Sequence, residues 1–175
     1  MIFSATPFEG LYVIEPERRI DDRGYFARTM CRTEFEDHNL SYNFVQANES
    51  YNRTRGTLRG MHYQRDPHSE TKLVRCVRGA IFDVIIDLRP GSATYRQWKG
   101  FDLTAENGRS LYIPGGFAHG YMTLTDNAIV DYQVSSFYAP EAAAGVRYDD
   151  PAISIQWPLP ATNISPQDQQ WPLLG

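Results

Sequence analysis

Hydrophobic and polar residues alternate over short runs along most of the chain, the pattern of β-strands with one buried face. Turns rich in Gly, Pro, Asn and Asp separate these runs, as they do in proteins built mainly of strands. The predicted strands are 8–13, a run ending at Ile20, a run beginning at Tyr25, 44–50, 58–64, 72–77, 82–88, 98–103, 110–113, 120–124, 128–134 and 153–157.

Side-chain direction follows from the alternation within each predicted strand. Lys72, Val74 and Cys76 point to one side of their strand, and Tyr132 shares an apolar face with its neighbours two residues away. Gly60 is a candidate for a bulge. The strands 120–124 and 128–134 are expected to pair with each other as a hairpin across the turn at 125–127.

Only two short helices are expected. Thr33 and Glu36 have the spacing of a capping box, which predicts a helix over 34–39. Ser165 followed by Pro166 predicts a helical turn near the end of the chain, where Asp168 could serve simply as an acid in the first turn.

Many short strands with little helix indicate an all-β fold, and a jelly-roll barrel fits best. A chain of 175 residues, 42% of them hydrophobic, suits one domain over 1–175. The N-terminal strands are candidates for exchange with a partner chain, because isolated edge strands need a cover.

Charge and composition narrow the function classes. The net charge of −4 argues against a nucleic-acid partner. There is no apolar run long enough for a membrane span and no start typical of a signal peptide, so we expect a soluble, cytoplasmic protein. The two cysteines, Cys31 and Cys76, are predicted to be reduced and structural.

The stretch 56–79 carries the candidate chemistry. Arg59, His62 and Lys72 lie on two predicted strands joined by a turn, so two cations and a proton acceptor are expected to share one wall. No acid lies nearby on these strands, and such a cluster is costly unless an anion fills it. The pattern therefore indicates a substrate that is acidic and easily deprotonated.

A second pattern concerns metal binding. Gly108, Pro114, Gly116 and His119 have the spacing of the second signature of the cupin jelly rolls. The first signature requires a second histidine where this chain has Gln64, and two histidines alone make a poor metal site. A metal cupin stays an alternative, and His119 fits either a loop hydrogen bond or anion binding.

Taken together, the motifs resemble the dTDP-4-dehydrorhamnose 3,5-epimerase family over nearly the whole chain. The motifs that carry the resemblance are Asp-Arg-Gly-Tyr-Phe at 22–26, Gln-x-Asn-x-Ser at 46–50, Gly-x-Leu-Arg-Gly-x-His-Tyr-Gln at 56–64, Lys-Leu-Val at 72–74, Asp-x-x-x-Asp-Leu-Arg at 83–89, Ile-Pro-x-Gly-Phe-Ala-His-Gly at 113–120 and Ser-x-x-Asp at 165–168.

The resemblance implies a homodimeric, metal-free cupin jelly roll without a cofactor, acting on a nucleotide-linked 4-keto-6-deoxyhexose. It implies that His62 is the base, Asp168 orients it, Tyr132 is the acid and Lys72 stabilises the enolate. The implied substrate-binding residues are Arg59 for pyrophosphate, Arg23 and Phe26 from the partner chain, Gln46 and Asn48, His119 in the sugar pocket, and Tyr138 near the nucleotide.

Three departures from the family pattern concern ligand recognition. Arg28 and the run 142–144, including Ala143, stand where the family commonly has glutamate, and Gln167 stands where it often has lysine. The identity of the nucleotide, or of the sugar's outer groups, is therefore open. Whether one or both of carbons 3 and 5 are inverted is open for a separate reason, because it depends on how the sugar tilts between base and acid. A non-catalytic jelly roll that binds a sugar nucleotide is a further alternative.

Overall fold

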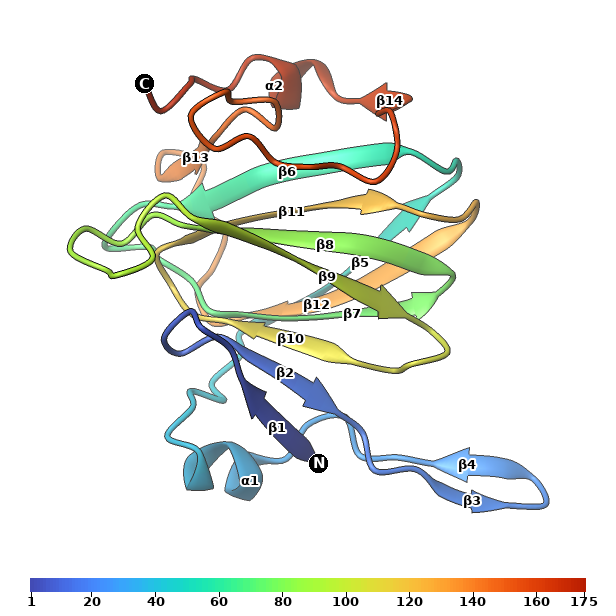
Figure 1. Ribbon diagram of the computed structural model, residues 1–175. Helices are drawn as coiled ribbons and strands as arrows, with labels where there is room; N and C mark the ends of the chain where they lie inside the picture. Colours follow the sequence, from blue (N-terminus) through green and yellow to red (C-terminus); the bar gives the residue numbers. More distant parts are fainter.

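The computed structural model describes all residues 1–175 and consists mainly of β-strands (Figure 1). The strands are β1 (Ile2–Ala5), β2 (Tyr12–Glu15), β3 (Arg19–Asp21), β4 (Gly24–Phe26), β5 (Gln46–Asn52), β6 (Thr57–Gln64), β7 (Lys72–Arg78), β8 (Ala80–Asp87), β9 (Trp98–Thr104), β10 (Ser110–Ile113), β11 (Phe117–Thr123), β12 (Ala128–Val134), β13 (Ala143–Gly145) and β14 (Asn163–Ile164). The helices are α1 (Arg32–Asp37) and α2 (Pro166–Gln169).

Two large sheets form the body of the molecule, with strand orders β1-β2-β10-β7-β12-β5 and β13-β6-β11-β8-β9. Between them lies a buried apolar cluster to which both sheets contribute, including Val74 and Val130 from one and Ile81 and Ile85 from the other. Two mostly antiparallel sheets packed face to face with their inward side chains in a shared core form a jelly roll. The predicted all-β, cupin-type fold is confirmed.

The outer face of the first sheet is covered by α1. Phe35 of this helix is fully buried and packs with Leu73 and Tyr112 of the sheet. The predicted helix exists, but the predicted capping box is wrong: the helix begins at Arg32, so Thr33 lies inside it, and no side chain caps it. Neither α1 nor α2 is long and apolar enough to cross a membrane.

The C-terminal segment covers the outer face of the second sheet, above β6 in Figure 1. Its strand β14 pairs parallel to β6, and Ser165 then caps α2 by accepting a hydrogen bond from the backbone N–H of Asp168. The predicted strand at 153–157 is wrong: the segment is irregular, and Ile153 is buried against the outer face of β8 without joining a sheet. The predicted helical turn is confirmed.

Two further predictions about strands are wrong. The strands β11 and β12 do not form a hairpin, because β11 lies between β6 and β8 and β12 lies between β5 and β7 in the other sheet. The turn between them crosses from sheet to sheet, since neither strand has a free edge for the other. The predicted strand at 8–13 begins only at Tyr12; Phe8 and Leu11 belong to a turn that is seated in the core.

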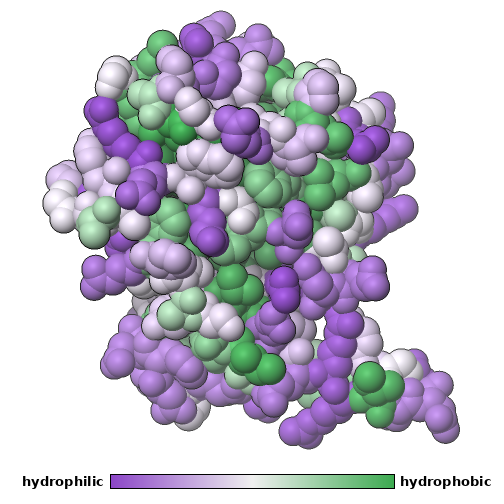
Figure 2. Space-filling view, in the orientation of Figure 1, coloured by the Kyte–Doolittle hydropathy of each residue, from purple (hydrophilic) through white to green (hydrophobic).

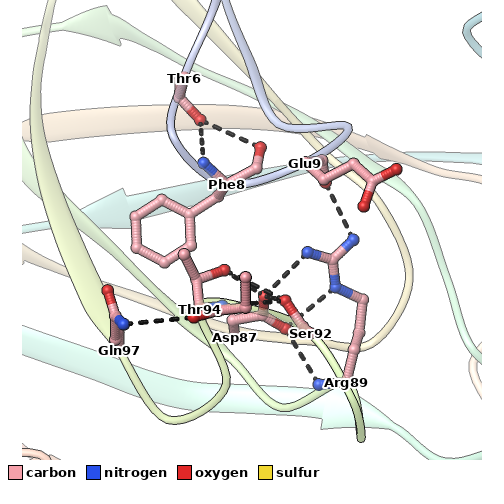
Figure 3. A network of polar contacts seen from close by, with 9 residues as sticks. Thr6, Phe8, Glu9, Asp87, Arg89, Ser92, Thr94 and Gln97 are labelled. Carbon is pink, nitrogen blue, oxygen red and sulfur yellow. Dashed lines mark hydrogen bonds and ion pairs between the residues drawn. The ribbon is translucent and has the colours of Figure 1, made fainter.

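A polar network joins the loop after β8 to the turn before β2 (Figure 3). The buried carboxylate of Asp87, at the end of β8, accepts hydrogen bonds from Arg89, Ser92 and Thr94, and Arg89 also donates to the backbone carbonyl of Glu9. Burial alone would raise the pKa of Asp87, but these charged and neutral donors outweigh burial and lower it far below its usual range.

The hairpin of β3 and β4 extends away from the body of the molecule (Figure 1). Apolar side chains on it are open to solvent, with Ile20 81% and Phe26 66% exposed. Figure 2 shows hydrophobic atoms on this projection at the lower right. Large apolar side chains on a projecting hairpin are typical of a surface that another chain covers.

Candidate active site

A cavity of about 550 Å³ lies between the two sheets and gathers most of the sequence-predicted site residues. Asp168 lies behind the cavity, against His62. Arg23 and Phe26 lie outside it on the projecting hairpin, where the Arg23 side chain is 90% exposed and paired only with Asp21. The predicted residues that line the cavity are Gln46, Asn48, Arg59, His62, Lys72, His119, Tyr132 and Tyr138.

Strand register explains how the first sheet presents its residues. Tyr132 of β12 lies directly opposite Asn48 of β5 and Val74 of β7. Gln46 and Lys72 both lie opposite Val134, two positions further along β12. Residues opposite one another in a ladder share a face, and so do residues two apart along a strand, so all of these side chains point inward.

A bulge in β6 brings Arg59 and His62 onto one face. Residues three apart along a regular strand point to opposite faces. Here three steps along β6, from Arg59 to His62, match two steps along β11, from Tyr121 to His119, so β6 carries one extra residue at Gly60. The predicted bulge is thus confirmed, and it places both side chains in the cavity.

Gly60 meets two requirements of this bulge. Its φ of +130° is a conformation that side chains disfavour, and a Cβ atom there would lie 2.5 Å from the Cα atom of Gly120 on β11. The glycine therefore allows the close approach of β6 and β11 on which the placement of Arg59 and His62 depends.

The expectation that Arg59, His62 and Lys72 share one wall is wrong. The strand β6 belongs to one sheet and β7 to the other, so the loop between them crosses the barrel. His62 and Arg59 approach the cavity from one side, and Lys72 approaches it from the other with Tyr132. The base and the acid implied by the resemblance thus lie in opposite sheets.

His62 and Asp168 form a close pair. The Nε2 atom of His62 lies 2.5 Å from Oδ1 of Asp168, which is only 4% exposed and also accepts a hydrogen bond from the indole nitrogen of Trp171. Burial acts to raise the pKa of Asp168, but its donors, His62 first among them, lower it overall. An ionised carboxylate accepts the hydrogen on Nε2, which leaves Nδ1 of His62 free to take a proton.

An acid from outside these strands lies beside the cationic cluster. Glu70, in the loop before β7, forms an ion pair with Lys72, and both side chains are largely buried. Burial lowers the pKa of Lys72, and Glu70 opposes this effect. The expectation from the sequence concerned the strands alone, and Glu70 comes from the loop between them.

Gln64 stands where the cupin signature requires a second histidine. Its amide donates to Glu70 and to the backbone carbonyls of His68 and Phe137, and its carbonyl accepts from the backbone N–H of Ala139. Its polar atoms are therefore committed to two loops. No group of three or more His, Cys, Asp and Glu side chains suited to a metal ion is present.

Tyr132 is held in its protonated form. Burial raises the pKa of the phenol, Glu70 raises it further, and Arg59 opposes the two. A phenol that keeps its proton at neutral pH can donate it during a reaction.

Arg59 donates its Nε hydrogen to Asn52 at 2.8 Å, so its terminal nitrogens remain for an anion.

A second histidine–aspartate pair lies beside the first. His119 is directly opposite His62 in the ladder of β6 and β11, and its Nε2 atom lies 2.8 Å from Oδ2 of the fully buried Asp83. Burial raises the pKa of Asp83, while His119 lowers it. Asp83 was not among the site residues predicted from the sequence. An acid within an otherwise apolar strand is nevertheless a signal of a buried, paired carboxylate, because a buried charge needs a partner.

The departures from the family pattern lie partly at the cavity. Ala143, Ala144 and Gln167 line it, so these positions present neutral side chains. Arg28 instead forms an ion pair with Glu34 at the surface.

The sequence model of a family described as dTDP-4-dehydrorhamnose 3,5-epimerase matches residues 5–175. The protein of that name from Methanothermobacter thermautotrophicus is 46% identical over 172 residues, which are 97% of this chain and 92% of that protein. A crystal structure of the enzyme of that name from Bacillus anthracis, with TDP and PPi bound, matches with a TM-score of 0.96 at 40% identity, covering 99% of each chain.

A protein from Streptomyces niveus named dTDP-4-dehydrorhamnose 3-epimerase is also similar. It is 40% identical over 168 residues, which are 95% of this chain and 81% of that protein. Proteins named for inversion at one carbon and at two carbons are therefore similar to this chain to nearly the same degree.

Proposed function

Because the chain belongs to the dTDP-4-dehydrorhamnose 3,5-epimerase family, we propose that it converts dTDP-4-dehydro-6-deoxy-D-glucose to dTDP-4-dehydro-L-rhamnose. The observation that carries the proposal is that His62 and Tyr132 line one cavity from opposite sheets. Inversion at carbon requires a base on one face of the sugar and an acid on the other.

The substrate makes this proton exchange feasible. Carbons 3 and 5 flank the keto group at carbon 4, so loss of a proton from either gives an enolate. Nδ1 of His62 takes the proton, and the hydroxyl of Tyr132 returns one from the other face. Asp168 is a positioning residue that fixes the tautomer of His62. Proton transfer moves no net electrons, so this chemistry needs no redox cofactor.

Two cations match the two negatively charged groups of this reaction, the enolate and the pyrophosphate. The ammonium group of Lys72, on the Tyr132 side, stabilises the charge that develops on the keto oxygen. Arg59, with its guanidinium anchored by Asn52, binds the pyrophosphate. Separate cations for the enolate and for the pyrophosphate hold the sugar between base and acid.

Polar and aromatic groups complete the binding site. Gln46, Asn48, His119 and Tyr138 line the same cavity and hold the sugar and nucleotide. The preferred nucleotide is thymidine diphosphate, in agreement with the names of the relatives. Inversion at carbon 3 alone is the second candidate, favoured by the similarity to the protein named a 3-epimerase.

The working form is a homodimer in which the N-terminal hairpin crosses to the partner. Its exposed Ile20 and Phe26 support this arrangement, because solvent contact of such side chains is unfavourable. Arg23 and Phe26 would then reach the nucleotide in the partner's cavity. The hairpin projects from the body, as this exchange requires (Figure 1).

Deuterium exchange tests the proposal. The protein is incubated in heavy water with the 4-keto-6-deoxy sugar carried on thymidine, cytidine and guanosine diphosphates, and carbons 3 and 5 are followed by NMR. We expect deuterium at both carbons with the thymidine sugar, and none with His62→Asn. Exchange at carbon 3 alone supports the second candidate, and no exchange with any nucleotide contradicts both.

A further inference from the structure

Glu70 is a charged cavity residue that the reaction described above does not use. Its side chain is only 13% exposed, and it lines the cavity with Lys72 and Tyr132. One carboxylate oxygen accepts from the ammonium group of Lys72, and the other accepts from the amide of Gln64. Both oxygens therefore have fixed donors inside the protein.

We propose that Glu70 is a positioning residue for the reaction: its carboxylate holds the ammonium group of Lys72 at the cavity wall, and Gln64 holds the carboxylate. The inference rests on the proposed role of Lys72 at the enolate oxygen. It assigns to Glu70 an action through Lys72 and no contact with the reacting carbons.

The chemistry of lysine explains why such a partner is needed. A lysine side chain has a flexible four-carbon stem, so its charged end is not held in place by the stem. Its charge is compact, and burial favours its neutral form. A neutral amine stabilises an enolate poorly. An ammonium group has three N–H donors, so after one binds Glu70, two remain for the keto oxygen. The carboxylate thus fixes the group without blocking it.

The same carboxylate acts on the proposed acid. Glu70 raises the pKa of Tyr132 as well as opposing the lowered pKa of Lys72, so both groups keep their protons to higher pH. Removing the charge of Glu70 lowers both pKa values. The other titratable groups that line this cavity are Arg59, His62, Tyr63, His119, Tyr121 and Tyr138.

Glu70→Gln tests the inference, because it keeps the shape and removes the charge. Between about pH 6 and pH 10, we expect the alkaline limb of kcat/KM to move to lower pH. At neutral pH we expect a loss of about tenfold, smaller than the loss of about 10²–10³ expected for Lys72→Met. Glu70→Asp keeps the charge and therefore keeps the wild-type alkaline limb, at a reduced rate.

A double variant separates action through Lys72 from a direct contact with substrate. At neutral pH, where Tyr132 keeps its proton with or without Glu70, Glu70→Gln combined with Lys72→Met should be within about twofold of Lys72→Met alone, because residues that act as one unit are not additive. Glu141→Gln is the matched control: this side chain is 72% exposed at the surface, and its pH profile should equal that of the wild type.

Two results would overturn the inference while the proposed function stands: a Glu70→Gln profile that superimposes on the wild-type profile, or losses that add in the double variant. A purely structural role for Glu70 predicts the first of these, with a lowered melting temperature. Absence of exchange by the wild-type protein contradicts the proposed function itself, so the two failures are distinguishable.

Discussion

His62 and Asp168 are 106 residues apart in the chain, yet their side chains approach to 2.5 Å. The parallel pairing of β14 with β6 brings the C-terminal segment alongside the strand that carries His62. The helix α2 follows directly, and its Asp168 points inward. The strand β6 and the C-terminal segment, distant in the sequence, thus meet at the proposed base. The C-terminal segment is therefore part of the site as well as a cover for the second sheet.

Asp168→Asn is predicted to slow deuterium exchange by about 10²–10⁴. An amide has no charge with which to stabilise the imidazolium that forms. It also allows the His62 tautomer that carries its hydrogen on Nδ1, and in that tautomer Nδ1 cannot accept a proton. Exchange at carbons 3 and 5 in heavy water gives the rates. Asp149→Asn, at an exposed ion pair, is the control and should retain the wild-type rate. A rate for Asp168→Asn within about twofold of wild type would show that the pair serves only stability.

The crossing hairpin predicts complementation between two inactive variants. His62→Ala lacks the base, and Arg23→Ala lacks the guanidinium that we propose acts in the partner's cavity. In a heterodimer purified with two tags, one cavity has His62 and receives an intact Arg23. We expect about half the wild-type activity from such heterodimers, because one of two equivalent sites is complete.

The same heterodimer gives the opposite result if Arg23 acts within its own chain. Each cavity then lacks one of the two residues, and the heterodimer is as inactive as the parent variants. A monomer in solution, measured by light scattering, would also contradict the crossing hairpin.

Asp87 is predicted to stabilise the fold in a pH-dependent way. Its pKa is lowered in the folded state, so its stabilisation is complete above the unfolded value of about 3.9 and is lost as pH falls toward the folded value. Asp87→Asn should lower the free energy of unfolding by about 3 kcal/mol at neutral pH, because it breaks a buried charged network.

Urea unfolding of wild type and Asp87→Asn at several pH values measures this effect. We expect the difference between the two proteins to shrink below about pH 4. The control Asp131→Asn removes a partly exposed partner of Arg75 and should cost less than about 1 kcal/mol. A constant difference across the pH range would contradict the assignment of the effect to the charge of Asp87.

The sequence predicted the features that depend on local pattern. The bulge at Gly60, the inward face of Tyr132 and the cap at Ser165 follow from neighbours within a few residues, and the structure has all three. Motif resemblance added Asp168, whose closeness to His62 no local pattern predicts.

Pairing between strands was less predictable, because alternation fixes the face of a residue but not its partner. β11 is buried on both faces, and β12 buries only the face of Ala128, Val130 and Val134, yet neither pattern says which strand lies beside it, so the two sequences fit a hairpin as well as two separate sheets. The same ambiguity placed Lys72 on the wall of His62. Glu70 was missed because loop residues carry no periodic signal for the direction of their side chains.

The most direct test of the central claim compares wild type with Tyr132→Phe in heavy water. The claim is that His62 removes the proton from one face of the sugar and Tyr132 supplies one from the other. Wild type should then give a product that is both deuterated and inverted. Tyr132→Phe should give deuterated sugar with its configuration retained, because only His62 remains to return a proton. Inverted product from Tyr132→Phe at the wild-type rate would contradict the claim.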